Sequence, residues 1–217
     1  SYPLICGSIM SKKIAEGIKG LVLDIKTGNG AFMYTEDMAK ELGILLKEIG
    51  ELNGLTVKVA ITDMNQPLGN YSGIASEISE SIDALKGNGP SDLMDIVFYL
   101  AQQAIEIFNE SVTKEKLSII IDSGLAYEKF EQMVEAHGGS LRKFNSMNYQ
   151  SPKFRHLIKS PSSGYIKSFE TKKIGELLSM IGGGRLNNSD GIDNYSGLRV
   201  YKKLSDNVST GEPILEF

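Results

Sequence analysis

The sequence contains no tryptophan, a single cysteine and two histidines among its 217 residues. Cys6 has no partner within the chain, which excludes an internal disulfide framework and fits a reducing compartment such as the cytoplasm. A zinc site is not expected with so few cysteine and histidine ligands. His137 precedes two glycines where a helix should end, and His156 lies in a strand-like stretch. We assign neither histidine to catalysis.

Long apolar runs and an excess of basic residues are also missing. No run approaches the roughly 20 apolar residues of a membrane span, and we see no signal peptide. Lys and Arg number 23 against 27 Asp and Glu, which gives a net charge of −4. We therefore expect no membrane and no nucleic-acid partner. The chain begins with Ser rather than Met, which is consistent with a processed or truncated protein.

The richest stretch is residues 3–33. Ser8 and Lys12 are four residues apart in a predicted helix, so they share a face and could grip a carbonyl and a ring N–H of a planar ligand. A buried strand at 21–25 and a glycine-rich turn at 26–30 follow. Residue types alone favour a plain surface role for Ser8 and Lys12. The turn suits a binding loop and a simple connection about equally.

The next segments predict an α/β fold. A helix over 35–53, capped by Thr35, leads to an alternating strand over 55–61, so two strand–turn–helix units place their loops at one sheet edge. Asp63, at the end of the second strand, could orient a ligand or form a turn, and the turn is favoured. We predict a buried helix over 93–108. One or two helices are predicted over 113–136, with Tyr127, Phe130, Met133 and Val134 facing the core.

Composition changes near Asn145. A segment rich in Ser, Pro and Asn at 146–163 predicts a linker to a β-rich end, with strands at 164–168 and 197–201, a helix at 171–181, and a turn over 206–213 before a last strand. We predict a small helical-domain remnant at 1–17, a central α/β sheet domain at 18–145 and an α+β portion at 146–217. The end resembles the hammerhead half of biotinyl and lipoyl carrier domains.

Four segments carry a more specific resemblance. Residues 8–17, 21–33, 62–69 and 197–215 are similar to the pyrimidine-nucleoside phosphorylase and thymidine phosphorylase family. The similarity covers essentially the whole chain, which corresponds to about the second half of such an enzyme. It implies a pentosyltransferase that converts a pyrimidine nucleoside and phosphate to free base and pentose 1-phosphate.

The resemblance also implies roles for individual residues. Ser8 and Lys12 would hold the base and stabilise the charge that it gains in the reaction. Ile9 would wall the pocket, Phe32 would pack near the ring, and Gly30 would lie where two domains close. The family's phosphate-binding loop and most dimer-forming helices lie upstream. We therefore expect a homodimer for the full-length protein and no turnover by this chain alone.

The resemblance also implies a monovalent cation, potassium, at a second place in the chain. It implies no organic cofactor. The ligands of the cation would be the main-chain oxygens of Leu68 and Tyr71 and the carboxylate of Glu80, which is the hard oxygen donor that such an ion prefers. The alternative is that Glu77 and Glu80 are exposed residues of a helix over 72–86.

Two other functions compete with phosphorolysis. A carrier or interaction module would use the hammerhead-like end, but Lys202 and Lys203 precede the turn instead of sitting at a hairpin tip. An enzyme like anthranilate phosphoribosyltransferase would need an Asp–Glu metal pair at a strand end, which we do not find. The choice between uridine and thymidine stays open.

Overall fold

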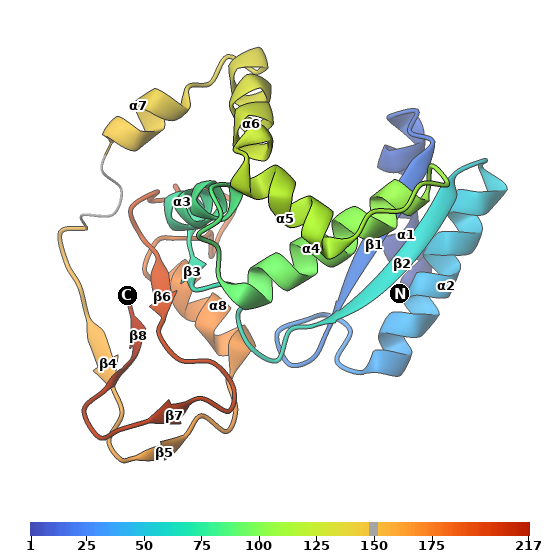
Figure 1. The fold of residues 1–217 in the computed structure, drawn as a ribbon. Helices are drawn as coiled ribbons and strands as arrows, with labels where there is room; N and C mark the ends of the chain where they lie inside the picture. Colours follow the sequence, from blue (N-terminus) through green and yellow to red (C-terminus); the bar gives the residue numbers. More distant parts are fainter. Residues whose placement is uncertain (148–151) are drawn as a thin grey trace. The chain divides into compact units, whose positions relative to one another are not determined.

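The computed structural model describes residues 1–147 and 152–217. These residues form two compact units (Figure 1). The first unit comprises residues 1–65 and 95–117, and the second comprises residues 66–94 and 118–217. The domain boundaries expected near residues 17 and 145 stay a prediction.

A parallel strand pair forms the sheet of the first unit. Strand β1 (Gly20–Thr27) pairs with β2 (Thr56–Asp63), from Gly20 beside Thr56 to Thr27 beside Asp63. Parallel neighbours need a crossover, and helix α2 (Glu36–Leu52) supplies it. The hydroxyl of Thr35 accepts a hydrogen bond from the Met38 N–H at 3.3 Å, so the predicted cap is confirmed. The predicted α/β class is confirmed with it.

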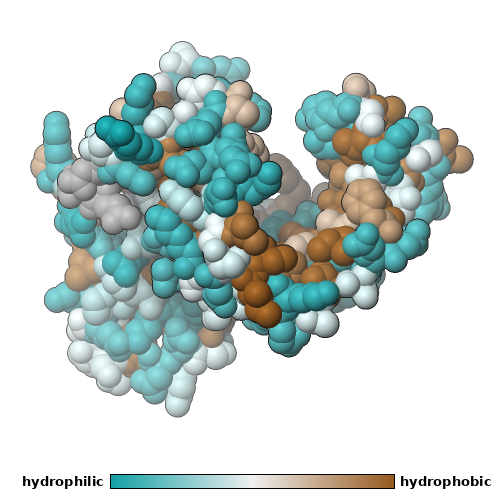
Figure 2. Space-filling view, turned by 45° about the horizontal axis from the view of Figure 1, so that its top comes forward, coloured by the Kyte–Doolittle hydropathy of each residue, from teal (hydrophilic) through white to brown (hydrophobic). Residues whose placement is uncertain are grey.

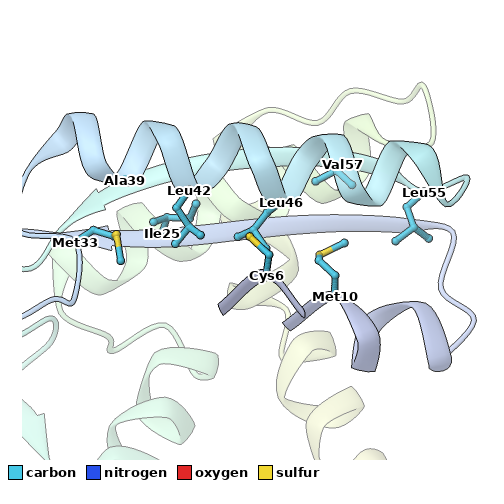
Figure 3. Close-up of a cluster of buried hydrophobic side chains, with 9 residues drawn as sticks. All are labelled: Cys6, Met10, Ile25, Met33, Ala39, Leu42, Leu46, Leu55 and Val57. Carbon is cyan, nitrogen blue, oxygen red and sulfur yellow. The ribbon is translucent and has the colours of Figure 1, made fainter. Parts of the chain in front are cut away.

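The core of the first unit lies between this sheet and two helices. Helix α1 (Tyr2–Ala15) contributes Cys6 and Met10, and α2 contributes Leu42 and Leu46 (Figure 3). The full cluster is Cys6, Met10, Ile25, Met33, Ala39, Leu42, Leu46, Leu55 and Val57. Burial raises the pKa of the Cys6 thiol, so Cys6 is a core residue without the thiolate character of a nucleophile.

The prediction of a buried helix over 93–108 is wrong, and the prediction of core-facing residues in the later helix is wrong for Met133. In α4 (Ser91–Glu106) only Phe98 is buried, and Phe108 beyond it is 70% exposed. In α6 (Leu125–Ala136) Met133 is 51% exposed, whereas Tyr127, Phe130 and Val134 are partly buried. Apolar side chains therefore remain at the surface, as Figure 2 shows for one face. The cause is that apolar spacing predicts a helix stripe, whereas burial also requires a partner to cover it.

The observed ends of the helices in this region agree with those predicted from the sequence. Helix α5 (Lys114–Asp122) and α6 are separated at Gly124, which has a left-handed φ of 80°. His137 caps the end of α6, as predicted. Helix α3 (Ile74–Leu85) precedes this region, and the short α7 (Leu141–Ser146) follows it.

Two antiparallel sheets of short strands and α8 (Thr171–Met180) complete the second unit. The larger sheet has the order β3 (Tyr71–Ser72), β6 (Leu198–Val200), β8 (Pro213–Glu216) and β4 (Leu157–Lys159). The smaller sheet joins β5 (Gly164–Tyr165) to β7 (Asn207–Val208). The predicted strand over 164–168 is thus shorter than expected, and β7 lies inside the predicted turn over 206–213.

The predicted linker over 146–163 is wrong in part, because it contains β4. This strand pairs with β8, and His156 and Phe217 exchange two main-chain hydrogen bonds beside it, at 2.6 and 3.0 Å. Local composition cannot predict a strand whose partner lies so far along the chain. Residues 148–151 of the predicted linker lie outside the described residues.

No helix within the described residues has both the length and the apolar character needed to cross a membrane.

Candidate functional site

Ser8 and Lys12 lie on one exposed face of α1. Cys6 and Met10, each two positions earlier, are buried in the core. Two helical positions correspond to about 200° of rotation, so Ser8 and Lys12 point away from the core. Ile9 is partly buried and packs against the core cluster. The helix and the shared face agree with the sequence, and contact with a base stays a prediction.

The loop after β1 is held against the end of β2. Met64 N–H donates to Thr27 O at 2.6 Å, Gly30 N–H donates to Met64 O at 3.0 Å, and Asn29 N–H donates to the Asn65 side chain at 3.0 Å. Gly28 has a φ of 110°, and a Cβ atom there would lie 2.7 Å from the Asn65 amide oxygen. This position therefore requires glycine. The Gly30 backbone is consequently fixed at the carboxyl end of the sheet.

Phe32 and Met33 occupy opposite environments at the end of this loop. Met33 is 6% exposed and belongs to the core cluster, and its O atom accepts from Gly28 N–H at 3.1 Å. Phe32 is 93% exposed. An aromatic ring held in water on an anchored loop offers apolar area to a ligand without serving the core.

A polar triad that was not predicted from the sequence lies near the carboxyl ends of the two strands. The Lys26 ammonium is 2.6 Å from the Asp24 carboxylate and donates to the Thr62 hydroxyl at 2.8 Å. Thr62 in turn donates to Asp24 at 2.5 Å. Strand alternation puts Ile25 toward the core and its neighbours Asp24 and Lys26 on the other face. This alternation is the sequence feature from which the shared face of Asp24 and Lys26 could have been predicted.

Asp63 forms a turn, as favoured from the sequence. Its carboxylate accepts hydrogen bonds from the Asn65 main-chain N–H, at 3.2 Å, and from the Asn65 amide group.

In the second unit, Glu80 is only 7% exposed, so the alternative of an exposed Glu80 is wrong. Glu77 is exposed, as that alternative expected. The Glu80 carboxylate accepts from Asn70 N–H at 2.7 Å and from Tyr71 N–H at 3.4 Å. Burial raises the pKa of Glu80, and the two N–H donors and the nearby Lys203 charge oppose that rise. Helix periodicity could not show this burial, because a loop and not another helix covers Glu80.

Glu80 and Tyr71 also line an open cavity of about 1130 Å³ within the second unit. The Arg199 guanidinium lies over the Tyr71 ring at 5.3 Å and over the Tyr201 ring at 4.6 Å. Tyr71 pairs with Arg199 across β3 and β6, while Asn70 O accepts from Val200 N–H at 2.7 Å. In this alternating pattern the main-chain groups of Tyr71 face away from β6.

The residues present fit a monovalent cation. A buried carboxylate next to a loop that can supply main-chain oxygens is a donor set suited to a hard ion. Among residues 1–147 and 152–217, no cluster of three or more His, Cys, Asp and Glu side chains is placed to hold a metal. A site built mainly from main-chain oxygens does not require such a cluster.

Neither lysine of the proposed carrier alternative is displayed at a hairpin tip. Lys202 forms an ion pair with Glu212 at 2.5 Å and donates to Asn207 O at 3.0 Å. Lys203 forms an ion pair with Asp92 at 2.9 Å. A carrier lysine must be free to react, so these contacts argue against that function.

Sequence comparison relates this chain to known proteins. Residues 165–217 match the sequence model of the pyrimidine nucleoside phosphorylase C-terminal domain. Over 221 aligned residues the chain is 41% identical to a pyrimidine-nucleoside phosphorylase of Staphylococcus aureus strain bovine RF122 / ET3-1, covering 99% of this chain and 51% of that protein. The protein of that name from strain USA300 is 40% identical over the same shares.

The chain resembles pyrimidine-nucleoside phosphorylases along 99% of its length. It spans about half the length of the curated relatives that it matches. The matched C-terminal domain covers the β5, α8, β6, β7 and β8 region of the second unit.

Proposed function

We propose that this chain is part of an enzyme that phosphorolyses pyrimidine nucleosides. The reaction would join a phosphate oxygen to the sugar C1′ atom and break the C1′–N bond, which yields pentose 1-phosphate and the free base. The observation that carries the proposal is the 41% identity along 99% of the chain to a protein of that name. Uridine and thymidine both remain candidate substrates.

The base would be bound by the exposed face of α1. As the C1′–N bond breaks, its electron pair passes to the departing base, and negative charge grows on the base carbonyls. The Lys12 ammonium and the Ser8 hydroxyl would donate hydrogen bonds to that charge. Because the charge is greatest in the transition state, these donors would accelerate the reaction rather than only bind substrate. Ile9 would add an apolar wall to the pocket.

Phe32 and Gly30 would complete the base site from the loop after β1. The exposed Phe32 ring would pack near the base, which would remove apolar area from water. Gly30 would lie where the site closes. Closure of this kind excludes water and aligns the reacting groups.

A potassium ion would bind beside the second unit's loop. The Leu68 and Tyr71 carbonyls and the Glu80 carboxylate are its proposed ligands on this chain. The burial of Glu80 and its two N–H donors support the proposal, because they hold the carboxylate in place. The ion would neutralise a carboxylate that burial otherwise destabilises.

The same proposal covers how phosphate is bound, how the protein assembles and in which compartment it works. We infer from the family resemblance that phosphate is bound by the part of the enzyme that this chain does not span, and that the complete protein is a cytoplasmic homodimer. The single cysteine is compatible with that compartment.

A pair of neighbouring lysines tests the role of α1. Lys12→Met and Lys13→Met each remove one charge from the same helix, in a version of the protein extended at its N-terminus by the part that the relatives carry. Lys13 forms an exposed ion pair with Glu16 at 3.0 Å, which is worth little. We expect Lys12→Met to lower kcat/KM about 100- to 1000-fold, as loss of one charge-stabilising donor does.

Lys13→Met should keep nearly full activity and serves as the matched control. Both variants should unfold at the same urea concentration as the parent. Equal loss of activity in the two variants would show that Lys12 has no specific role in binding the base.

A further inference from the structure

The Lys203 ammonium is enclosed by the loop that joins β2 to β3. It donates to Pro67 O at 2.7 Å and to Gly69 O, and it is 2.9 Å from the Asp92 carboxylate. Its side chain is only 20% exposed. A lysine ammonium has three N–H donors, so these three partners use all of them.

The same Asp92 oxygen binds the loop directly. It accepts from Gly69 N–H at 3.2 Å while it pairs with Lys203. Gly69 has a φ of 68°, so the chain turns sharply between the two carbonyls that Lys203 holds. Carbonyl oxygens that converge repel one another, and a positive charge between them offsets that repulsion. Lys203 therefore acts as a cation that is covalently tied to the chain.

Neighbours of Lys203 extend the contact along the loop. Leu204 N–H donates to the Gln66 side chain at 2.8 Å, and Val200 N–H donates to Asn70 O at 2.7 Å. The segment Arg199 to Leu204 thus holds the loop from Gln66 to Tyr71 at both ends and in the middle.

The contacts of residues 199–204 with the loop leave the carbonyls of the candidate cation ligands unused. Lys203 takes the carbonyls at 67 and 69, whereas the proposed ion takes those at 68 and 71. The Glu80 carboxylate accepts hydrogen bonds from the N–H groups of Asn70 and Tyr71 and so fixes them. Successive carbonyls on a turning loop point in different directions. Fixing the carbonyls at 67 and 69 therefore also sets the directions of those at 68 and 71.

We propose that Lys203 is a positioning residue for the cation site. It binds the carbonyls of Pro67 and Gly69 so that those of Leu68 and Tyr71 face the ion together with Glu80. The inference rests on the cation site of the proposed function. It gives the C-terminal β-rich portion a role beyond packing, because that portion supplies the tethered charge.

The adjacent lysine provides a matched control. Lys203→Ala and Lys202→Ala remove the same charge and stem from neighbouring positions, but Lys202 contacts Glu212 and Asn207 instead of this loop. Amide hydrogen exchange of Gly69, Asn70 and Tyr71 in this chain is the first readout. We expect at least tenfold faster exchange in Lys203→Ala and no change in Lys202→Ala.

Chemical rescue distinguishes a positioned charge from general damage. Propylammonium carries the charge and most of the stem that Lys203→Ala lacks, so it should restore slow exchange in that variant alone. If Lys203→Ala does not fold, Lys203→Met, which keeps the stem, is compared with Lys202→Met in the same way. Exchange in the position-203 variant as slow as in the position-202 variant would overturn the proposal.

The second readout is potassium dependence of phosphorolysis in the N-terminally extended protein. Lys203→Ala should raise the half-saturating potassium concentration at least tenfold while changing the KM for phosphate less than twofold. Faster exchange with an unchanged potassium requirement would mean that Lys203 is merely structural, and would overturn the proposal. An extended parent protein without phosphorolysis would refute the proposed function, and the exchange measurement would still decide whether Lys203 holds the loop.

Discussion

Phe32 and Met33 show how far apart the roles of adjacent residues can be. Met33 fills the core between α2 and the sheet, whereas Phe32 is almost fully exposed. A hydrophobicity pattern scores both as apolar and cannot separate them. The family resemblance singled out Phe32, and the structure supplies the physical distinction.

This contrast gives a prediction at the residue scale. Met33→Ala should lower the free energy of unfolding of this chain by about 2–5 kcal/mol, because it leaves a cavity in the core. Phe32→Ala should change that free energy by no more than about 0.5 kcal/mol, as expected for an exposed side chain. Urea unfolding followed by circular dichroism measures both.

The effect of Phe32→Ala should appear in activity instead of in stability. In the N-terminally extended protein, Phe32→Ala should lower kcat/KM for the nucleoside by about tenfold, which corresponds to the loss of one buried aromatic contact of about 1.4 kcal/mol. A destabilised Phe32→Ala with normal activity would place the ring in the core and contradict its proposed role.

Other residues mark the limit of what the sequence can tell. The shared face of Ser8 and Lys12 follows from their spacing, and the buried position of Cys6 is usual for a cysteine without a disulfide partner. The burial of Glu80 and the enclosure of Lys203 depend on a loop folding over them, and no local pattern reports that. The Asp24, Lys26 and Thr62 triad joins two strands and needs their register to be known.

At the scale of elements, the strands and helices of the first unit were predictable because their signals are local. Alternation, a Thr cap and glycine stops placed β1, α2 and β2 within two residues of their observed ends. The short strands of the second unit were not predictable to that degree. A two-residue strand such as β5 or β7 exists only through its partner, so composition alone cannot define it.

The turn at Gly69 provides a prediction at this scale. Gly69 and Gly54 both have left-handed φ values, 68° and 79°. An added Cβ at Gly54 meets no atom within 4 Å, whereas at Gly69 it would overlap the Glu80 carboxylate. Gly54→Ala should therefore cost only the backbone strain, about 1–2 kcal/mol.

Gly69→Ala should cost that strain and more. The Glu80 carboxylate would have to move, which breaks its hydrogen bonds to Asn70 and Tyr71 and adds about 2 kcal/mol or more. Guanidinium unfolding of the two variants measures the difference. Equal losses would show that Glu80 is free to move away and does not fix the turn.

At the scale of the whole molecule, each of the two units carries residues of a different proposed site. The first unit holds Ser8, Lys12, Gly30 and Phe32, and the second holds Leu68, Tyr71 and Glu80. The chain spans only about half the length of its curated relatives. A phosphorylase also needs groups that bind phosphate, and we expect these groups in the part that the chain does not span.

The most direct test is an assay of phosphorolysis. Uridine and thymidine are incubated with orthophosphate and either this chain or its N-terminally extended form, and release of uracil or thymine is followed by chromatography. We expect release by the extended protein and none by the chain alone. No release by either would contradict the phosphorylase assignment. Release by the chain alone would mean that its own residues, with Lys26 and Arg185 the first candidates, bind phosphate.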